Sequence, residues 1–288
     1  MGRTPTTRVI SICSLSHQNV WKLTSNLLPV HVSADEYLVY VPDEELEGFR
    51  SITNPAIEVL PQSSLGLQFS EKLLQAVNFA DNAQRYGWYL QQFLKIEGLM
   101  QSPARRVVIW DADCVPVREI KLFDESGMPI YMKASECHQE YFSMIERLLG
   151  LTRIQSHSFV IPGFPMQGDW VKRFINDIES YSGGMDWFDA IISCTDLTQK
   201  SGFSETETLG TWVANSYPGE YSLSDLAWER FGQSRFGPAS KFTPTEIVAL
   251  GKKKNLDIIS FENWDHRTLW KTLIRAARFL YEKVTRKN

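Results

Sequence analysis

Two carboxylates directly follow a run of apolar residues near the middle of the chain. Asp111 and Asp113, separated by one alanine, come after Val107–Trp110. A short apolar run rich in β-branched residues is typical of a buried strand, and carboxylates at its end would lie at the carboxyl edge of a sheet, where open α/β folds bind ligands. Two such aspartates repel each other unless a cation lies between them, and hard divalent ions prefer oxygen ligands. The pattern predicts a metal site holding a diphosphate, although an isolated Asp-x-Asp also fits an Asp-rich turn.

The segment before this strand could supply a positive charge to the same site. Gly87–Gly98 has helical periodicity, and Gln91 and Lys95 share one stripe of the helix. If this stripe faces the strand, both side chains reach the crevice beside Asp111, and Lys95 could neutralise phosphate as a point charge. The neighbouring Gln92 is interpreted as part of a solvated face.

Two glutamates in Ser204–Val213 have two interpretations. Ser204 followed by Glu207 fits a capping box, a structural role worth about 1 kcal/mol. Alternatively, Glu205 or Glu207 lies in the crevice as a general base or as a hydrogen-bond acceptor for sugar hydroxyls. Because capping occupies only one of the two, the interpretations are compatible, and Glu205 is the better candidate for substrate contact.

The elements that must position these residues alternate between strands and helices, which is typical of βαβ units and predicts an α/β fold with a mainly parallel sheet. Besides the Asp-x-Asp strand, strands are predicted at Arg8–Ser14, Glu36–Val41, Ala56–Leu60, Pro129–Lys133, Ser156–Ile161 and Leu256–Phe261. Helices are predicted at Val20–Leu28, Glu44–Arg50, Gln139–Leu149, Asp169–Tyr181 and Trp187–Cys194. Pro162–Gly168, a mobile Thr195–Phe203 and a lid-like Arg230–Pro244 are interpreted as loops.

Missing motifs and overall composition narrow the functional class. There is no G-x-G-x-x-G after the first strand and no G-x-x-x-x-G-K-[ST], which disfavours Rossmann dehydrogenases and P-loop NTPases. The net charge of −4 gives no argument for a nucleic-acid partner. The four cysteines form no Cys-x-x-Cys pair, and neither a signal-peptide pattern nor a membrane-spanning apolar stretch is present. We therefore expect a cytoplasmic protein.

The last residues, Arg267–Asn288, have apolar side chains at helical spacing and basic side chains between them. Such a helix could lie on an anionic membrane surface, or it could pack on the domain with its charge merely solvated. Both interpretations remain open. His266, just before this segment, is either a third metal ligand or an ordinary surface or capping residue.

Together these segments resemble the GT-A fold glycosyltransferases, which use nucleotide-sugar donors. They resemble more closely a bacterial subgroup from capsule and surface-polysaccharide gene clusters. The subgroup's motifs are a G-W-x-x-Q-Q-x-x-K helix, a D-x-D pair, a Ser-Phe-Val strand and an S-E-x-x-x-x-G segment, which match Gly87–Lys95, Asp111–Asp113, Ser158–Val160 and Ser204–Gly210. The subgroup often has an aromatic residue where this chain has Leu209.

The resemblance covers about Val9–Trp264 and implies a fold and a domain organisation. Residues 1–266 would form a GT-A domain, which is Rossmann-like, with a mainly parallel central sheet flanked by helices. Its nucleotide-sugar half would span about 1–118 and its acceptor half about 119–266. Residues 267–288 would be a basic amphipathic helix.

The resemblance also implies roles for individual residues. Asp111 and Asp113 would bind Mn²⁺ or Mg²⁺ on the donor diphosphate. The base would stack near Ile12–Ser14, and the implied donor-binding residues are Ser14, Gln91, Lys95, Trp110, Asp111 and Lys241, with Arg235 as an additional cation. An inverting reaction needs a carboxylate base, for which the candidates are Glu205, Glu207 and Asp186, with His157 behind them. A retaining reaction needs none, and the sequence does not decide between the two.

The implied partners are a nucleotide-diphosphate sugar and a polysaccharide, oligosaccharide or lipid-linked acceptor. The enzyme would work in the cytoplasm, or on the inner face of the plasma membrane if Arg267–Asn288 binds it. One alternative is a nucleotidyltransferase that makes the nucleotide sugar, but such enzymes carry a glycine-rich, basic loop after the first strand and Ser14–Asn19 has neither feature. Another alternative is a non-catalytic sugar-binding or scaffold protein of polysaccharide assembly.

Overall fold

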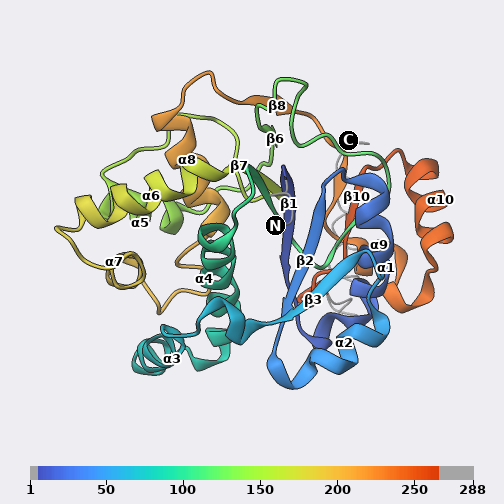
Figure 1. The fold of residues 1–288 in the computed structure, drawn as a ribbon, viewed down its shortest axis with the longest axis horizontal. Coiled ribbons are helices and arrows are strands. Elements are labelled where there is room, and N and C mark those ends of the chain that lie inside the picture. The colour runs from blue at the N-terminus through green and yellow to red at the C-terminus, as the bar shows by residue number, and fades with distance from the viewer. Residues whose placement is uncertain (1–5, 266–288) are drawn as a thin grey trace, which may run out of the picture.

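A five-stranded sheet lies at the centre of the computed structural model, which describes residues 6–265 (Figure 1). Its strand order is β3-β2-β1-β4-β7, in which the first four strands are mutually parallel and β7 is antiparallel to β4. The strands are β1 (Thr7–Ile12), β2 (Glu36–Val41), β3 (Ile57–Pro61), β4 (Arg106–Trp110) and β7 (Gly163–Gln167). The prediction of an α/β fold with a mainly parallel sheet is confirmed.

Helices cover both faces of this sheet. In Figure 1, α1 (Gln18–His31) and α2 (Leu46–Ile52) lie on one side, and α4 (Tyr86–Gln101) lies on the other. The connection from β3 to β4 contains α3 (Ser70–Phe79) and α4, and it returns the chain to the opposite side of β1 from β2. The carboxyl ends of β1 and β4 therefore flank a topological switch point, where open α/β sheets form their ligand crevice.

The second half of the chain adds a group of helices beside α4. These are α5 (Gln139–Leu149), α6 (Gly168–Tyr181), α7 (Trp187–Cys194) and α8 (Glu205–Ser216). Two short strands, β6 (Ile130–Met132) and β8 (Ser222–Ser224), pair in parallel. One hydrophobic core contains residues from Val9 to Ile258, so both halves of the chain fold around the same core. The boundary near residue 118 stays a prediction.

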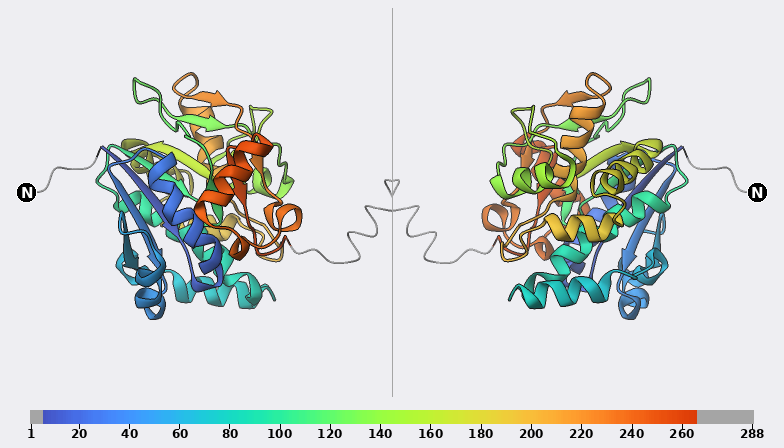
Figure 2. Two further views of the ribbon diagram at one scale, coloured as in Figure 1. Left: turned by 90° about the vertical axis from the view of Figure 1, so that its right-hand side faces the viewer. Right: turned by 90° about the vertical axis from the view of Figure 1, so that its left-hand side faces the viewer.

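A second, smaller sheet holds the end of the described chain beside the Asp pair. Its order is β5-β10-β9, formed by β5 (Cys114–Pro116), β10 (Ile258–Ser260) and β9 (Trp228–Glu229). It packs with α1 and α10 (Pro244–Lys254), which lie side by side in Figure 2. β10 is antiparallel to β5, and the Phe261 N–H donates to the Asp113 carbonyl at 2.9 Å. The exit of β10 therefore lies next to the exit of β4.

One predicted strand lies at a different place in the structure. Ser156–Ile161 is irregular apart from an isolated bridge between Ser158 and Ala134, whereas Gly163–Gln167, expected to be a loop, forms β7. Proline argues against a central strand, but β7 is an edge strand and tolerates Pro165. Gly163 is required because a Cβ there would lie 2.6 Å from the ring of Trp110.

Several element boundaries and loops also differ from expectation. α6 begins at Gly168, with Gln167 rather than Asp169 as its N-cap residue. The predicted lid-like loop at 230–244 contains α9 (Gly232–Phe236) and a 3-10 turn, η5 (Ala239–Lys241). The segment 195–203 is held in place, because Asn82 Nδ2 donates to the carbonyls of Leu197 and Gln199 at 2.7 and 2.9 Å.

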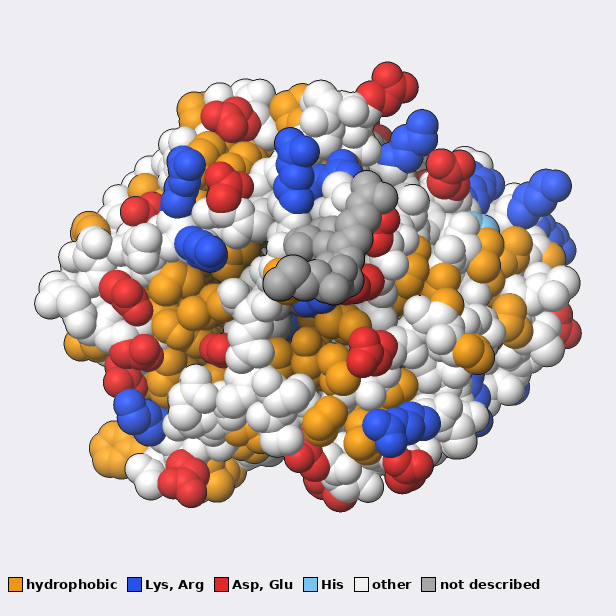
Figure 3. Space-filling model, viewed as in Figure 1, with side chains coloured by type: hydrophobic (Ala, Val, Ile, Leu, Met, Phe, Trp, Pro, Cys, Tyr) orange, Lys and Arg blue, Asp and Glu red, His pale blue; other side chains and the backbone are white. Residues whose placement is uncertain are grey.

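The predicted tail helix at 267–288 and His266 lie outside the described residues. No helix within residues 6–265 combines the length and the apolar character needed to cross a membrane. On the face shown in Figure 3, Lys and Arg side chains are interspersed with Asp and Glu side chains over the described part. Neither sign of charge therefore dominates the described part of this face.

Substitution of two helical glycines by alanine should change the free energy of unfolding in opposite directions. A Cβ at Gly210 in α8 would lie 2.0 Å from Cγ of Phe159, a fully buried ring, whereas a Cβ at Gly87 in α4 meets nothing within 4 Å. We expect Gly210→Ala to lower the free energy of unfolding by about 1–3 kcal/mol through overpacking. Gly87→Ala should raise it by up to about 1 kcal/mol, because alanine is the better helix former. Urea unfolding of both variants tests this pair, and equal effects would contradict it.

Candidate functional site

The Asp pair lies in a tight turn at the carboxyl edge of the sheet. The Asp111 N–H donates to the Pro162 carbonyl at 2.8 Å, and the Cys114 N–H donates to the Asp111 carbonyl at 3.0 Å. Trp110 Nε1 donates to the Cys114 carbonyl at 2.9 Å, so the indole supports the turn from below. The Asp111 side chain is 35% exposed, and Asp113 is half-buried. The turn therefore presents two carboxylates at the switch point between β1 and β4.

A buried lysine joins this turn to a second helix. Lys95 Nζ lies 2.6 Å from Asp111 Oδ1 and 2.8 Å from Glu205 Oε1. Burial alone would lower the pKa of this ammonium, but the carboxylates of Asp111 and Glu205 outweigh burial and raise it above its usual value. Lys95 is therefore charged at neutral pH and bridges α4, the exit of β4 and the start of α8.

Glu205, the first residue of α8, is turned toward Lys95 and is only 2% exposed. Burial raises the pKa of its carboxyl, and Lys95 opposes that rise. Its backbone N–H donates to Gln92 Oε1 at 3.2 Å, so Gln92 is buried rather than solvated as expected. A paired and buried Glu205 is not open to an acceptor hydroxyl in this conformation.

Glu207 connects α8 to the Ser-Phe-Val segment. Its Oε2 accepts from Ser158 Oγ at 2.5 Å and from the Phe159 N–H at 3.1 Å. Ser204 Oγ accepts from the Glu207 N–H at 3.3 Å, but the Glu207 side chain does not return to Ser204, so only half of the predicted capping box forms. Phe159 in turn packs on Gly210. The two motifs from the sequence are thus one structural unit that fixes α8.

A third carboxylate, Glu262, follows β10. The sequence analysis did not select it. Burial and the neighbouring Asp111 raise the pKa of Asp113 to about 6. Burial also raises the pKa of Glu262 to about 7, where Arg230 opposes and Asp113 reinforces the rise. Arg230 Nε donates to Glu262 Oε1 at 2.6 Å, and its guanidinium also pairs with Glu136. The sequence did contain a signal for Glu262, because this residue directly follows the last predicted strand, just as Asp111 directly follows the apolar strand before it.

The exit of β1 completes this edge. Ser14 lies after β1, with its Oγ 2.6 Å from Ser16 Oγ. His17 Nε2 lies 2.9 Å from Asn263 Nδ2, which links the segment after β1 to the segment after β10. The structure therefore brings Ser14, Lys95, Asp111, Asp113 and Glu205 to one edge of the sheet. Gln91 is partly buried on α4, one turn before Lys95.

Other predicted site residues have different surroundings. Trp110 is fully buried, so its ring cannot contact a donor. Asp186 is exposed and caps α7 by accepting from the Phe188 N–H, and its charge acts on Glu97, which is on the opposite face of α4 from Lys95. Lys241 is exposed in η5, which packs on α1.

Two secondary candidates also lie apart from the carboxylates at the β4 exit. Arg235 pairs with Glu229 in the small sheet. His157 lies in the irregular segment before Ser158, where its ring packs edge-on against Phe159. Neither side chain contacts the Asp pair in the part of the chain that the structure describes.

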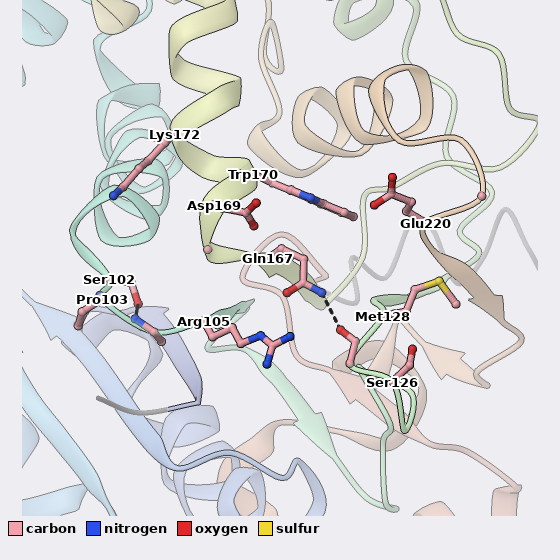
Figure 4. A pocket seen from close by; sticks show the side chains of 14 residues that line it. Ser102, Pro103, Arg105, Ser126, Met128, Gln167, Asp169, Trp170, Lys172 and Glu220 are labelled. Carbon is pink, nitrogen blue, oxygen red and sulfur yellow. Dashed lines mark hydrogen bonds between the residues drawn. The ribbon is translucent and has the colours of Figure 1, made fainter. Parts of the chain in front are cut away.

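A separate pocket of about 750 Å³ lies at the other end of β4 (Figure 4). It is lined by residues before β4 and at the start of α6, including Arg105, Asp169, Trp170 and Lys172. Gln167 Nε2 donates to the Gly127 carbonyl at 2.6 Å across it. Because this pocket is at the amino edge of the sheet, it is distinct from the carboxylate site.

The residues at the carboxyl edge suit a hard divalent ion only in part. Asp111 and Asp113 supply close oxygen ligands whose mutual repulsion a cation would relieve. Within residues 6–265, however, no group of three or more His, Cys, Asp or Glu side chains is arranged to hold a metal. Mg²⁺-type sites commonly use one or two carboxylates and complete their shell with substrate phosphates and water. The side chains fit a metal that arrives with, or is completed by, a phosphate ligand.

The sequence model of one protein family, described as a family of unknown function (DUF6492), matches residues 25–229. The chain belongs to this family. The matched range contains Lys95, Asp111, Asp113 and Glu205, whereas Arg230 and Glu262 of this DUF6492 member lie just beyond it. No curated protein matches the sequence.

Among solved structures, mouse xyloside xylosyltransferase 1 in its apo form is similar to this DUF6492 member, with 10% sequence identity and a TM-score of 0.47. The similarity covers 91% of this chain and 99% of that one. At this score the likeness has no bearing on the assignment of the site.

The charge bridge on Lys95 can be tested by a double-mutant cycle in this DUF6492 member. Lys95→Met leaves two carboxylates without their cation, and we expect it to lower the free energy of unfolding by about 3–5 kcal/mol. Glu205→Gln should also destabilise the protein, and the double variant should cost clearly less than the sum because the two residues interact directly.

Lys72→Met is the matched control in the same denaturation experiment. Lys72 pairs with Asp189 at 2.7 Å, but it is 61% exposed, and removal of such a surface pair should cost at most about 1 kcal/mol. Similar losses for Lys72→Met and Lys95→Met, or strict additivity of the cycle, would contradict the assigned bridge.

Proposed function

We propose that this chain is a metal-dependent glycosyltransferase that moves a sugar from a nucleoside diphosphate sugar to a hydroxyl group of an acceptor. The observation that carries the proposal is the Asp111–Asp113 turn at the β1/β4 switch point, with the charged Lys95 fixed beneath it. Carboxylates at the carboxyl edge of such a sheet, beside a fixed cation, suit a ligand that combines a divalent ion with a diphosphate.

The reaction explains why charge is concentrated there. When the bond between the sugar and the diphosphate breaks, negative charge develops on the leaving oxygens, and positive groups fixed in advance stabilise it. A bound Mn²⁺ or Mg²⁺, held by Asp113 and Asp111, would act as a Lewis acid on the diphosphate. Lys95 holds the turn in position for that ligand through its contact with Asp111.

The two aspartates have unequal surroundings, which supports different roles. Asp111 already has one oxygen on Lys95, so its second oxygen is the one free to accept from a ribose or sugar hydroxyl. Asp113 makes no ion pair with the residues described, and its raised pKa reflects burial and the charge of Asp111. We therefore assign Asp113 as the main metal ligand and Asp111 as a ligand that also positions the donor.

Glu205 and Glu207 are positioning residues in this proposal rather than general bases. Glu205 Oε1 is occupied by Lys95, and Glu207 Oε2 by Ser158 and Phe159. Glu207 Oε1 has no partner among the described residues, but it is buried, as both side chains are. Their role is to fix α8 against α4 beside the crevice. The proposal therefore includes no carboxylate base from α8, and we propose a polysaccharide, oligosaccharide or lipid-linked glycan as the acceptor.

The rival nucleotidyltransferase function has less support. After β1 the chain enters a 3-10 turn, η1 (Leu15–His17), which contains neither glycine nor a basic side chain other than His17. A loop of this kind lacks the backbone freedom with which glycine-rich loops wrap a triphosphate.

A thermal-shift screen of nucleotides and nucleotide sugars with Mn²⁺ tests the proposal, because a ligand that binds only the native state raises its melting temperature. We expect at least one nucleoside diphosphate to raise the melting temperature with Mn²⁺ and not with EDTA. Asp113→Asn and Asp111→Asn should each weaken its binding at least tenfold, about 1.4 kcal/mol, by calorimetry.

Asp169→Asn is the matched control for this binding experiment. Asp169 is an exposed carboxylate at the amino edge of the sheet, in the pocket of Figure 4, and its loss should leave nucleotide binding unchanged. The proposed function would be overturned if nucleotide binding were the same with and without the metal and were unchanged by the two substitutions at the β4 exit.

A further inference from the structure

An arginine at the start of α4 has no ion-pair partner within residues 6–265. Arg85 ends the 3-10 turn η4 (Ala83–Arg85), and its guanidinium stacks on Trp88, with Cζ 4.3 Å from the ring centroid. Its Nε is buried and without a hydrogen-bond partner. Its side chain makes neither a hydrogen bond nor an ion pair with any residue of the described part of the chain.

Arg85 is half-buried, so its charge is only partly solvated. Burial lowers the pKa of Arg85, and the neighbours within residues 6–265 that oppose this are Tyr89 and Tyr141. Partial desolvation of a charge without a partner has a cost, which an anion bound at Arg85 would offset. A guanidinium held by an aromatic ring, with its donors unused, is prepared to receive an anion from outside the chain.

Tyr141 relates Arg85 to the candidate site. Burial raises the pKa of the Tyr141 hydroxyl to about 12, and the charges of Glu205 and Arg85 both act on it, in opposite directions. Glu205 is the residue that shares Lys95 with Asp111. Tyr141 is therefore near both Arg85 and Glu205.

The surroundings of Arg85 are rigid. Tyr89 accepts from the Gly202 N–H at 3.1 Å and donates to the Gln199 carbonyl at 3.2 Å. These bonds fix the segment before α8 against the first turn of α4. A bound anion would therefore meet a preformed site, which reduces the entropy lost on binding.

Arg85 is too far from Asp111 to share the donor diphosphate. It precedes Lys95 by ten residues, which at the helical rise of 1.5 Å per residue corresponds to roughly 15 Å. An anion on Arg85 must therefore belong to a different part of the bound substrates.

We propose that Arg85, supported by Trp88 and Tyr141, binds a carboxylate or phosphate group of the acceptor; this rests on the proposed glycosyltransferase function. The planar fork of a guanidinium pairs with two oxygens of either group, and stacking on Trp88 sets the plane of that fork. The acceptor is then an acidic sugar or a sugar phosphate rather than a neutral glycan.

The test compares glucuronate, glucose 1-phosphate and glucose, each titrated into the full chain by NMR. Each titration is run with and without saturating Mn²⁺ and the nucleoside diphosphate found in the thermal-shift screen. We expect glucuronate or glucose 1-phosphate, or both, to bind at least tenfold more tightly than glucose. The comparison of glucuronate with glucose 1-phosphate then shows whether the bound group is a carboxylate or a phosphate. Arg85→Gln should remove that preference, and Arg85→Lys should retain only part of it.

Arg106→Gln is the matched control in these titrations. Arg106 also stacks on an aromatic ring, 5.1 Å from Phe123, and also has a buried, unpartnered Nε, but it begins β4 at the opposite edge of the sheet. Its loss should leave the preference intact. Equal or undetectable binding of the three sugars, or a preference that survives Arg85→Gln, overturns the proposal. Loss of metal-dependent nucleotide binding would instead overturn the proposed function, so the two failures are distinguishable.

Discussion

The interaction on which the site depends is the pair of short contacts from Lys95 Nζ to Asp111 and Glu205. These three residues come from α4, the exit of β4 and the start of α8, which lie far apart in the sequence. A charge buried this deeply is stable only with its partners in place, so any shift of one element leaves an uncompensated ion. The bridge is therefore a positional constraint, and it fixes where Asp111 can present its remaining oxygen.

A second set of contacts supports that constraint from the far side of α8. Glu207 holds Ser158 and Phe159, and Phe159 occupies the space that a side chain at position 210 would need. A polar contact and a close apolar contact together fix the position of α8, and with it Glu205. The residues of the Ser-Phe-Val and S-E-x-x-x-x-G motifs thus act by holding α8 in position.

The sequence predicted the central sheet and one side of the site because those features are local. The Asp pair after an apolar strand, and the helical stripe ending at Lys95, need only periodicity to be recognised. The partners of Glu205 and Glu207 could not be predicted, because a capping box and a tertiary contact use the same residue types. β7 was missed because Gly163 and Pro165 are typical loop residues, and only the ring of Trp110 and the edge position explain them. Glu262 was missed although the strand before it was predicted, because a single carboxylate after a strand is not a motif. Arg230 was missed because it follows β9, a strand of two residues that leaves no periodicity.

The proline in β7 also affects how the molecule behaves toward its own copies. β4, which carries the Asp pair, is an interior strand, and β7 closes the sheet on that side. An open sheet edge is a template for a strand of another molecule, and proline at an edge removes a donor from that template. Pro165 thus makes edge-to-edge aggregation less favourable beside the strand that carries the two carboxylates.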